Sequence, residues 1–234
     1  MHADCLNRSF SPLASALALG AALRITAWFL VLAATPVRLA AQGKAEFTPF
    51  AGLYLPTSDE LEFRNVVVTG DKFTAKHKTT VVFGGRLGVW VTNRVAVEGS
   101  FGYAPSKVEG TYTDPSNATS SSDTTGHVIL ASARVLVGFG PAGGNTSWHL
   151  ILGGGMVSHG GPAYDGTSGL TDFGGIAGIG ARFKIGPSLA IRLDVEDNLF
   201  SAKFKDDATA AETASKFQND IVILLGLAVP FGGK

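Results

Sequence analysis

The sequence predicts an all-β fold: an eight-stranded, antiparallel, up-and-down transmembrane β-barrel with short periplasmic turns and long extracellular loops. Three observations predict it. Large apolar residues alternate with small or polar ones in eight segments, which is the period of a β-strand. The connections between these segments are alternately short and long. Within the segments, the charged residues fall on the face opposite the apolar one, which is the reverse of a soluble cavity-forming barrel.

The composition agrees with a membrane barrel. Glycine accounts for 30 of the 234 residues and charged residues for 16%, where about 7% glycine and about 25% charged residues are usual. The formal net charge is zero, so nothing indicates a nucleic-acid partner. The single cysteine, Cys5, lies before the predicted barrel, which excludes disulfides and thiol chemistry there. No His, Asp and Glu cluster has recognisable ligand spacing, and we expect no metal and no cofactor.

The N-terminus predicts a secretory signal over residues 1–41, which leaves residues 42–234 as one barrel domain. Arg24 precedes an apolar run over residues 25–34, and small residues end the segment at Ala41. This is the layout of a cleaved signal peptide. A membrane anchor is the alternative, but the apolar stretch is shorter than the roughly 20 residues that a spanning helix needs. We therefore expect cleavage after Ala41.

No apolar run after residue 41 is long enough for a spanning helix, so the chain is read as a series of strands. They are residues 45–55, 78–91, 94–103, 127–139, 148–157, 172–185, 189–200 and 220–231. The short turns are 92–93, 140–147 and 186–188, and the long polar loops are 56–77, 104–126, 158–171 and 201–217. Short turns and long loops collect at opposite ends of an antiparallel meander. The pattern therefore predicts a barrel whose N- and C-termini both lie on the periplasmic side, with the short turns.

Each strand has one continuous apolar face. The last strand is the most regular, because every odd position from Ile221 to Phe231 is large and apolar. The apolar faces of the second to eighth strands have the following first and last residues: Val81 to Val91, Val95 to Tyr103, Ile129 to Phe139, Trp148 to Met156, Phe173 to Ile185, Leu189 to Leu199, and Ile221 to Phe231. Only a closed barrel can satisfy the backbone amides of such strands within a bilayer, so these faces are expected to contact lipid.

The opposite faces carry a set of charges that is predicted to fill the lumen. Its members are Glu46, Arg86, Glu98, Arg134, Arg182, Lys184, Arg192, Asp194 and Glu196. Opposite signs on adjacent strands predict salt bridges across the lumen, with Arg182 and Lys184 facing Asp194 and Glu196. The interior of an eight-stranded barrel is just wide enough for side chains to fill it, and an unpaired buried charge is costly. A packed polar plug is therefore expected, and a narrow pore is the alternative. His149 is predicted to be a lumen residue.

A third hypothesis is a lipid-modifying enzyme at the outer rim. The candidate groups are Ser158, His159, Asp165, Asp172, His127 and Asp123. Ser158 and His159 are sequence neighbours, and neighbours on a strand point to opposite faces. A nucleophile and its base need hydrogen-bond contact, and no intact enzyme motif is present. We therefore expect no catalytic residue.

Three short motifs carry a family resemblance. The TPFAGLY stretch at 48–54, the RxDxED stretch at 192–197 and the LGLxVPF stretch at 225–231 resemble bacterial outer-membrane proteins of the OmpA/OmpX-type β-barrel superfamily. The resemblance covers nearly all of the chain after the leader. It implies location in the bacterial outer membrane, and it implies that Phe231 is the signal read by the barrel-assembly machinery. Three residues follow Phe231 here, which departs from the family pattern.

These patterns together predict a non-catalytic integral outer-membrane protein with a structural or surface-interaction role. The expected partners are outer-membrane lipids and, during insertion, the barrel-assembly machinery. An extracellular ligand at the long loops is possible, and we expect a monomer.

Overall fold

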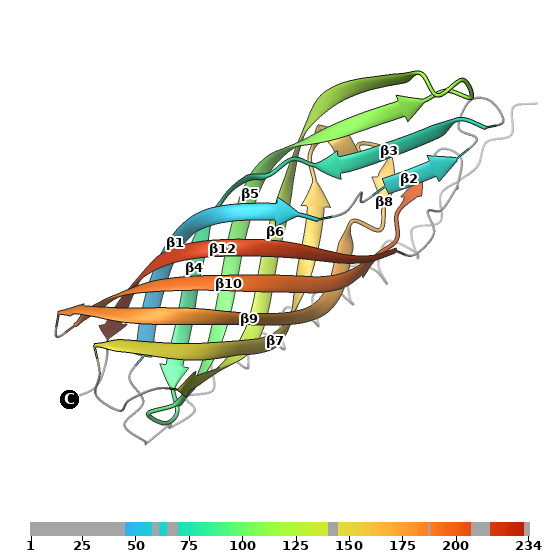
Figure 1. Ribbon diagram of the computed structural model, residues 1–234. Coiled ribbons are helices and arrows are strands. Elements are labelled where there is room, and N and C mark those ends of the chain that lie inside the picture. Colours follow the sequence, from blue (N-terminus) through green and yellow to red (C-terminus); the bar gives the residue numbers. More distant parts are fainter. Residues whose placement is uncertain are drawn as a thin grey trace, which may run out of the picture. The chain divides into compact units, whose positions relative to one another are not determined.

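The computed structural model describes residues 45–57, 61–64, 70–139, 145–186, 188–206 and 216–231. The predicted signal segment lies outside these residues. Eight strands form the wall: β1 (Ala45–Pro56), β4 (Thr80–Trp90), β5 (Val95–Thr113), β6 (Thr119–Phe139), β7 (Thr146–Gly160), β9 (Thr171–Gly186), β10 (Leu189–Ala202) and β12 (Lys216–Phe231) (Figure 1). Among the described residues, no helix has the length and apolarity to span a membrane.

The eight strands close into a ring, which confirms the predicted barrel. Every wall strand pairs antiparallel with its two neighbours in the order β5-β4-β1-β12-β10-β9-β7-β6, and the pairing of β5 with β6 closes the circle. β5 and β10 therefore lie on opposite sides of the lumen. Closure removes the sheet edges, so the wall strands satisfy one another's backbone groups.

The two faces of the wall have the distribution of a membrane barrel. On β10, Leu193 is 43% exposed, whereas its charged neighbours Arg192 and Asp194 are 2% and 1% exposed. The same inversion runs round the wall, where large apolar side chains such as Leu152 and Leu225 are more than half exposed. In water this arrangement would leave a broad apolar surface unburied, so the outer face is the lipid-contacting one.

The largest departure from the predicted strands is on the extracellular side. β5 and β6 were expected to end at the rim, with 104–126 as a loop, but they continue as a paired hairpin to Thr113 and Thr119. A tight turn joins them, in which the Asp114 carboxylate accepts hydrogen bonds from the backbone N–H groups of Ser116 and Ala118. Together with the Ser116 hydroxyl, these bonds lower the pKa of Asp114. The Ser- and Thr-rich sequence thus forms a strand because β5 offers it a continuous partner.

A second hairpin widens this extracellular sheet. β2 (Leu61–Arg64) pairs with β3 (Lys72–His77), and β3 pairs with the outer part of β5 from Lys72 to His77. Just after β3, the Lys78 ammonium lies 2.8 Å from the Asp123 carboxylate, which raises the pKa of Lys78. This pair is exposed, so solvent screening leaves it little effect on stability. Backbone pairing, more than charge, therefore orders the sheet.

The lumen is filled in three layers. Near the periplasmic end, Trp90 packs against a small apolar group formed by Ala96, Leu136, Ile151 and Ile176. A charged layer follows. The extracellular half is mainly apolar, with a few buried polar residues such as Asn198 and Asp220. It includes apolar residues from β1, β4, β5, β6, β7, β10 and β12 together with Tyr164 and Phe204. The charged side chains are thus enclosed between two apolar layers.

Candidate functional site

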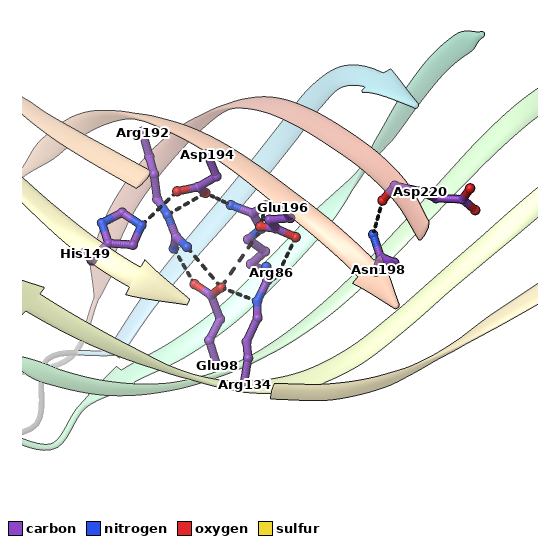
Figure 2. A network of polar contacts seen from close by, with 9 residues as sticks. All are labelled: Arg86, Glu98, Arg134, His149, Arg192, Asp194, Glu196, Asn198 and Asp220. Atoms are coloured by element: carbon purple, nitrogen blue, oxygen red, sulfur yellow. Dashed lines mark hydrogen bonds and ion pairs between the residues drawn. The ribbon is translucent and has the colours of Figure 1, made fainter. Parts of the chain in front are cut away.

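The charged layer is built by four strands. Arg86 comes from β4, Glu98 from β5 and Arg134 from β6. Directly opposite, β10 contributes Arg192, Asp194 and Glu196, which share the inner face because successive side chains of a strand alternate. Figure 2 shows the six side chains converging from opposite walls. We call these six residues the charge ring.

The charge ring is a closed cycle in which positive and negative groups alternate. Arg134 donates from Nε to Glu98 at 2.9 Å and from Nη1 to Glu196 at 2.6 Å. Glu98 also accepts from Arg192, whose Nε lies 2.8 Å from Asp194.

Arg86 completes the cycle. Its guanidinium pairs with the Asp194 carboxylate and donates from Nη2 to Glu196 at 2.6 Å. Its Nε lies 4.0 Å from Glu98, so that Glu98 has all three arginines around it. Each carboxylate therefore contacts at least two arginines, and each arginine at least two carboxylates.

The electrostatics of the charge ring depend on burial and balance. All six residues are at most 5% exposed, and three positive charges face three negative ones. Removing charges from water is expensive, and mutual attraction offsets this only where geometry and hydrogen bonding are good. A cycle without excess charge meets that condition, whereas loss of any one member leaves an uncompensated charge in the lumen.

Glycines on β9 make room for the charge ring. Gly180 lies directly across from Asp194, and a Cβ at Gly180 would overlap the Asp194 carboxylate and the His149 ring. A Cβ at Gly178 would lie 2.6 Å from the Val195 carbonyl oxygen. This part of the wall is therefore bare of side chains where the charges need space, which accounts for part of the glycine excess.

His149 on β7 is attached to the outside of the cycle. Its Nε2 lies 2.8 Å from Asp194 Oδ1, and the residue is 3% exposed. The alternation of inward and outward side chains predicts a lumen position for His149 but does not identify its partner. Higher in the barrel, Asn198 donates to the backbone oxygen of Asp220 at 3.3 Å (Figure 2). Tyr54 donates to the Asp220 carboxylate. Neither Asp220 nor Tyr54 was among the predicted site residues.

Three predicted lumen charges lie outside the charge ring. Arg182 does not face Asp194; its Nη2 pairs with Glu46 at 2.6 Å, and its guanidinium lies 5.9 Å from the centre of the Trp90 ring. Lys184 is exposed near the periplasmic turn. The register explains this, because the cross-strand neighbours of Asp194 and Glu196 on β9 are glycines. Phe231, the predicted assembly signal, is half-exposed at the end of β12.

The candidate catalytic groups are dispersed. The Ser158 hydroxyl is 2.8 Å from that of Thr171 on the outer face, whereas His159 is buried on the inner face. His127 stacks on Tyr103 at 5.4 Å between ring centres, and Asp123 is paired with Lys78. Asp165 is exposed, and Asp172 is half-buried near the start of β9. Among the described residues, no group of three or more His, Cys, Asp or Glu is placed to hold a metal ion.

A small cavity lies between the charge ring and the apolar layer above it. Glu196, Asn198, Ser100 and Ser132 contribute polar groups to its wall, and Phe50 contributes part of the apolar side. Its volume is about 20 Å³, which is room for about one water molecule. The side chains of this region thus pack closely and leave space for little besides a bound water.

A closed eight-stranded wall with apolar side chains outside and a balanced charge cluster inside defines an integral outer-membrane β-barrel protein. The family profile described as outer membrane protein beta-barrel domain matches residues 15–227, and the chain belongs to this family. The protein is accordingly located in the bacterial outer membrane. No curated protein sequence matches the chain.

Solved structures that share the fold include the following two. The outer membrane protein OprG from Pseudomonas aeruginosa has 12% sequence identity and a TM-score of 0.56, and the match covers 82% of this chain and 97% of OprG. The outer membrane protein AlkL, determined in DMPC lipid bilayers, has 14% identity and a TM-score of 0.57, with 81% of this chain and 90% of AlkL covered. At these identities the similarity concerns the fold.

Proposed function

We propose that the protein is a non-catalytic structural barrel of the outer membrane, with a lumen sealed by the charge ring and a surface-interaction role for its extracellular sheet. One observation carries the proposal: six buried charges form a closed cycle that links β4, β5 and β6 to the opposite strand β10. This cycle cross-links the barrel through its centre.

The charge ring also opposes ion flow. An ion entering this layer must displace a carboxylate or a guanidinium from its partners, which leaves buried charges unpaired. The layer above it, with Tyr54 and Phe204 fully buried, is mainly apolar, and its Asp220 carboxylate is already bonded to Tyr54, so an ion that crossed it would lose much of its hydration shell. A structural role requires no change in the charge ring or in the layer above it, whereas a pore would require the side chains of both layers to rearrange.

Conductance measurements test the sealed lumen. The purified protein in planar bilayers is expected to show no steady current steps above the bare membrane, because the ring residues are paired across the lumen. Arg134→Ser, which removes a side chain bonded to Glu98 and Glu196, is expected to give intermittent openings. Lys184→Ser, an exposed charge outside the ring, is the matched control and is expected to remain silent. Steady open-channel currents in the unmodified protein would reject the sealed-lumen proposal in favour of a narrow pore.

We propose that the partners of the barrel are outer-membrane lipids around its apolar face and the barrel-assembly machinery at Phe231, and that it acts as a monomer. The surface that an extracellular partner would meet is the sheet formed by β2, β3 and the outer parts of β5 and β6. Its outer face presents exposed or half-exposed threonines, serines and lysines, which is a hydrophilic contact surface.

A further inference from the structure

The extracellular mouth of the barrel contains a folded segment that the proposed function does not use. Residues 161–170, which we call the stopper, include the 3-10 turn η1 (Pro162–Tyr164) and β8 (Thr167–Ser168). β8 pairs with β11 (Lys205–Asp206), and the Leu170 carbonyl accepts a hydrogen bond from the His159 backbone N–H at 2.8 Å. In Figure 1, β8 lies at the end of the barrel that carries β2 and β3.

The backbone of the stopper is adapted to close contact. Gly161 and Gly169 have φ values of 98° and 79°, a backbone conformation that residues other than glycine rarely adopt. A Cβ on Gly161 would lie 3.1 Å from the Gly126 backbone on β6, and one on Gly169 would lie 2.7 Å from the Lys203 carbonyl oxygen. The stopper is therefore folded against β6 and the segment that follows β10.

Three stacked rings attach the stopper to the wall. The rings of His77 on β3, His159 on β7 and Tyr164 of the stopper contact one another in a triangle. The ring centre of His77 lies 5.6 Å from that of His159 and 5.7 Å from that of Tyr164, with interplanar angles of 29° and 27°, and the ring centres of His159 and Tyr164 are 5.7 Å apart. A hydrogen bond of 2.7 Å joins His77 Nε2 to the Tyr164 hydroxyl. All three residues are at most 3% exposed. Two imidazole side chains thus contact Tyr164 directly, and Phe204 adds a third ring 6.0 Å from it.

The two imidazoles favour the uncharged state. Burial lowers the pKa of His77 to about 3, with further lowering from His159 and His127, and burial lowers the pKa of His159 to about 4. Both histidines lie beyond the lipid-facing apolar band, since His77 precedes Val81 and His159 follows Met156.

Other titratable groups face this stack from neighbouring elements. Tyr54 on β1 meets His77 edge-on and donates to Asp220 on β12, and Tyr164 contacts both imidazoles. His127 on β6 faces outward beside Gly161. Phe200 and Phe204 also pack their rings against His159. The Asp220 carboxylate is thus already bonded to Tyr54, and the surroundings of His159 are largely aromatic, which agrees with the lowered pKa values of both histidines.

We propose that the stopper is an acid-released closure: protonation of His77 and His159 separates the stacked rings, detaches Tyr164 and opens the extracellular half of the lumen down to the charge ring. The direction follows from linkage. A histidine whose pKa is lower in the closed form stabilises closure while it is neutral, and this stabilisation declines as pH falls below about 6.5. Between pH 7.5 and pH 5, each histidine then raises the ratio of open to closed form by about 30-fold.

Thiol labelling can measure this opening, in a Cys5→Ser background. Val222→Cys places a thiol in the apolar layer beneath the stopper, at a position that is 1% exposed. Ser120→Cys places a thiol on the exposed outer part of β6 and serves as the reference. Ala96→Cys reports on the periplasmic layer below the charge ring. The probe is a pyridyl disulfide, which reacts with thiols at acidic as well as neutral pH, and folding is checked by the heat-modifiable gel shift.

The expected result is a rise of at least about 30-fold between pH 7.5 and pH 5 in the labelling rate of the Val222→Cys variant relative to the Ser120→Cys variant. The Ala96→Cys variant is expected to show no rise. His77→Phe together with His159→Phe, which keeps aromatic volume without a titratable group, is expected to abolish the rise in the Val222→Cys variant.

With only one of the two histidines replaced, the labelling ratio should rise less steeply as the pH falls, as expected for uptake of about one proton. These single variants decide the question if the double variant does not fold. Three outcomes would each overturn the proposal. They are a flat labelling ratio when both histidines are present, a rise that persists without the histidines, and an equal rise in the Ala96→Cys variant.

Discussion

Replacing Glu98 by alanine is expected to lower the free energy of unfolding of the barrel by about 3–5 kcal/mol, the range for breaking a buried ion pair from one side. Glu98 is the only member of the charge ring that has all three ring arginines around it. Its removal leaves Arg134 and Arg192 each short of a carboxylate in a layer closed above and below by apolar side chains. Urea unfolding in lipid vesicles, followed by the gel shift, measures the change.

The neighbouring residue provides the control for this substitution. Val97 lies on the same strand, is 51% exposed and faces lipid, so Val97→Ala removes no buried contact and is expected to change stability by less than about 1 kcal/mol. Glu98→Gln retains an acceptor oxygen but not the charge, and is expected to fall between the two. Equal stability of Glu98→Ala and Val97→Ala would show that the charge ring does not stabilise the fold.

Substituting alanine for Gly174 is expected to destabilise the barrel by about 3 kcal/mol, the upper end of the usual cost of overpacking. A Cβ at this inward position would overlap the Leu199 carbonyl oxygen across the β9–β10 ladder and lie 2.9 Å from the Phe200 Cβ. Backbone cannot move aside as a flexible side chain can, so the two strands must separate locally or the residue must remain strained. Folded yield and the urea midpoint report the effect.

Gly175 is the matched control because it is the next residue on the same strand and faces outward. A Cβ there meets nothing within 4 Å. Gly175→Ala is therefore expected to be neutral or to stabilise the barrel by about 0.5 kcal/mol, since alanine loses less conformational freedom on folding than glycine. If the two alanines behave alike, the close approach of β9 and β10 at Gly174 is not a constraint on the fold.

The wall of the barrel could be predicted from the sequence because the alternation of residues along each strand is enough to reveal the strand and its two faces. Alternation assigned the inner and outer faces strand by strand, and the inner assignment of Arg86, Glu98 and Arg134 follows from counting by twos. Parity cannot give the heights of strands relative to one another, which depend on the stagger of the whole ring. That is why Arg182 was expected beside Asp194, whereas the register places Gly180 across from Asp194 and Arg182 across from Arg192. The Arg182 side chain pairs with Glu46 instead.

The extracellular features needed information that no local pattern contains. The stretch at 119–126 is rich in serine and threonine and resembles a loop, yet it is a strand because β5 continues beside it. The contacts of His77 with His159 and Tyr164 join two segments that are distant in sequence, since His77 and Tyr164 are 87 residues apart. A lone histidine in each segment carries no signal of its own; a predicted pairing of β3 with β5 would have been needed to bring His77 to the mouth.

The position of the charge ring in the chain has a consequence for assembly. Arg192 and Glu98 are 94 residues apart, and Arg86 and Glu196 are 110 apart. The cycle therefore cannot form until the chain has nearly been completed and β10 lies opposite β5. A one-residue slip of β10 would turn its three charges toward lipid and bring Leu193 and Val195 inside. The charge ring therefore favours one assembled state: its buried charges can pair only in a barrel whose strands are in the correct register and whose sheet has closed.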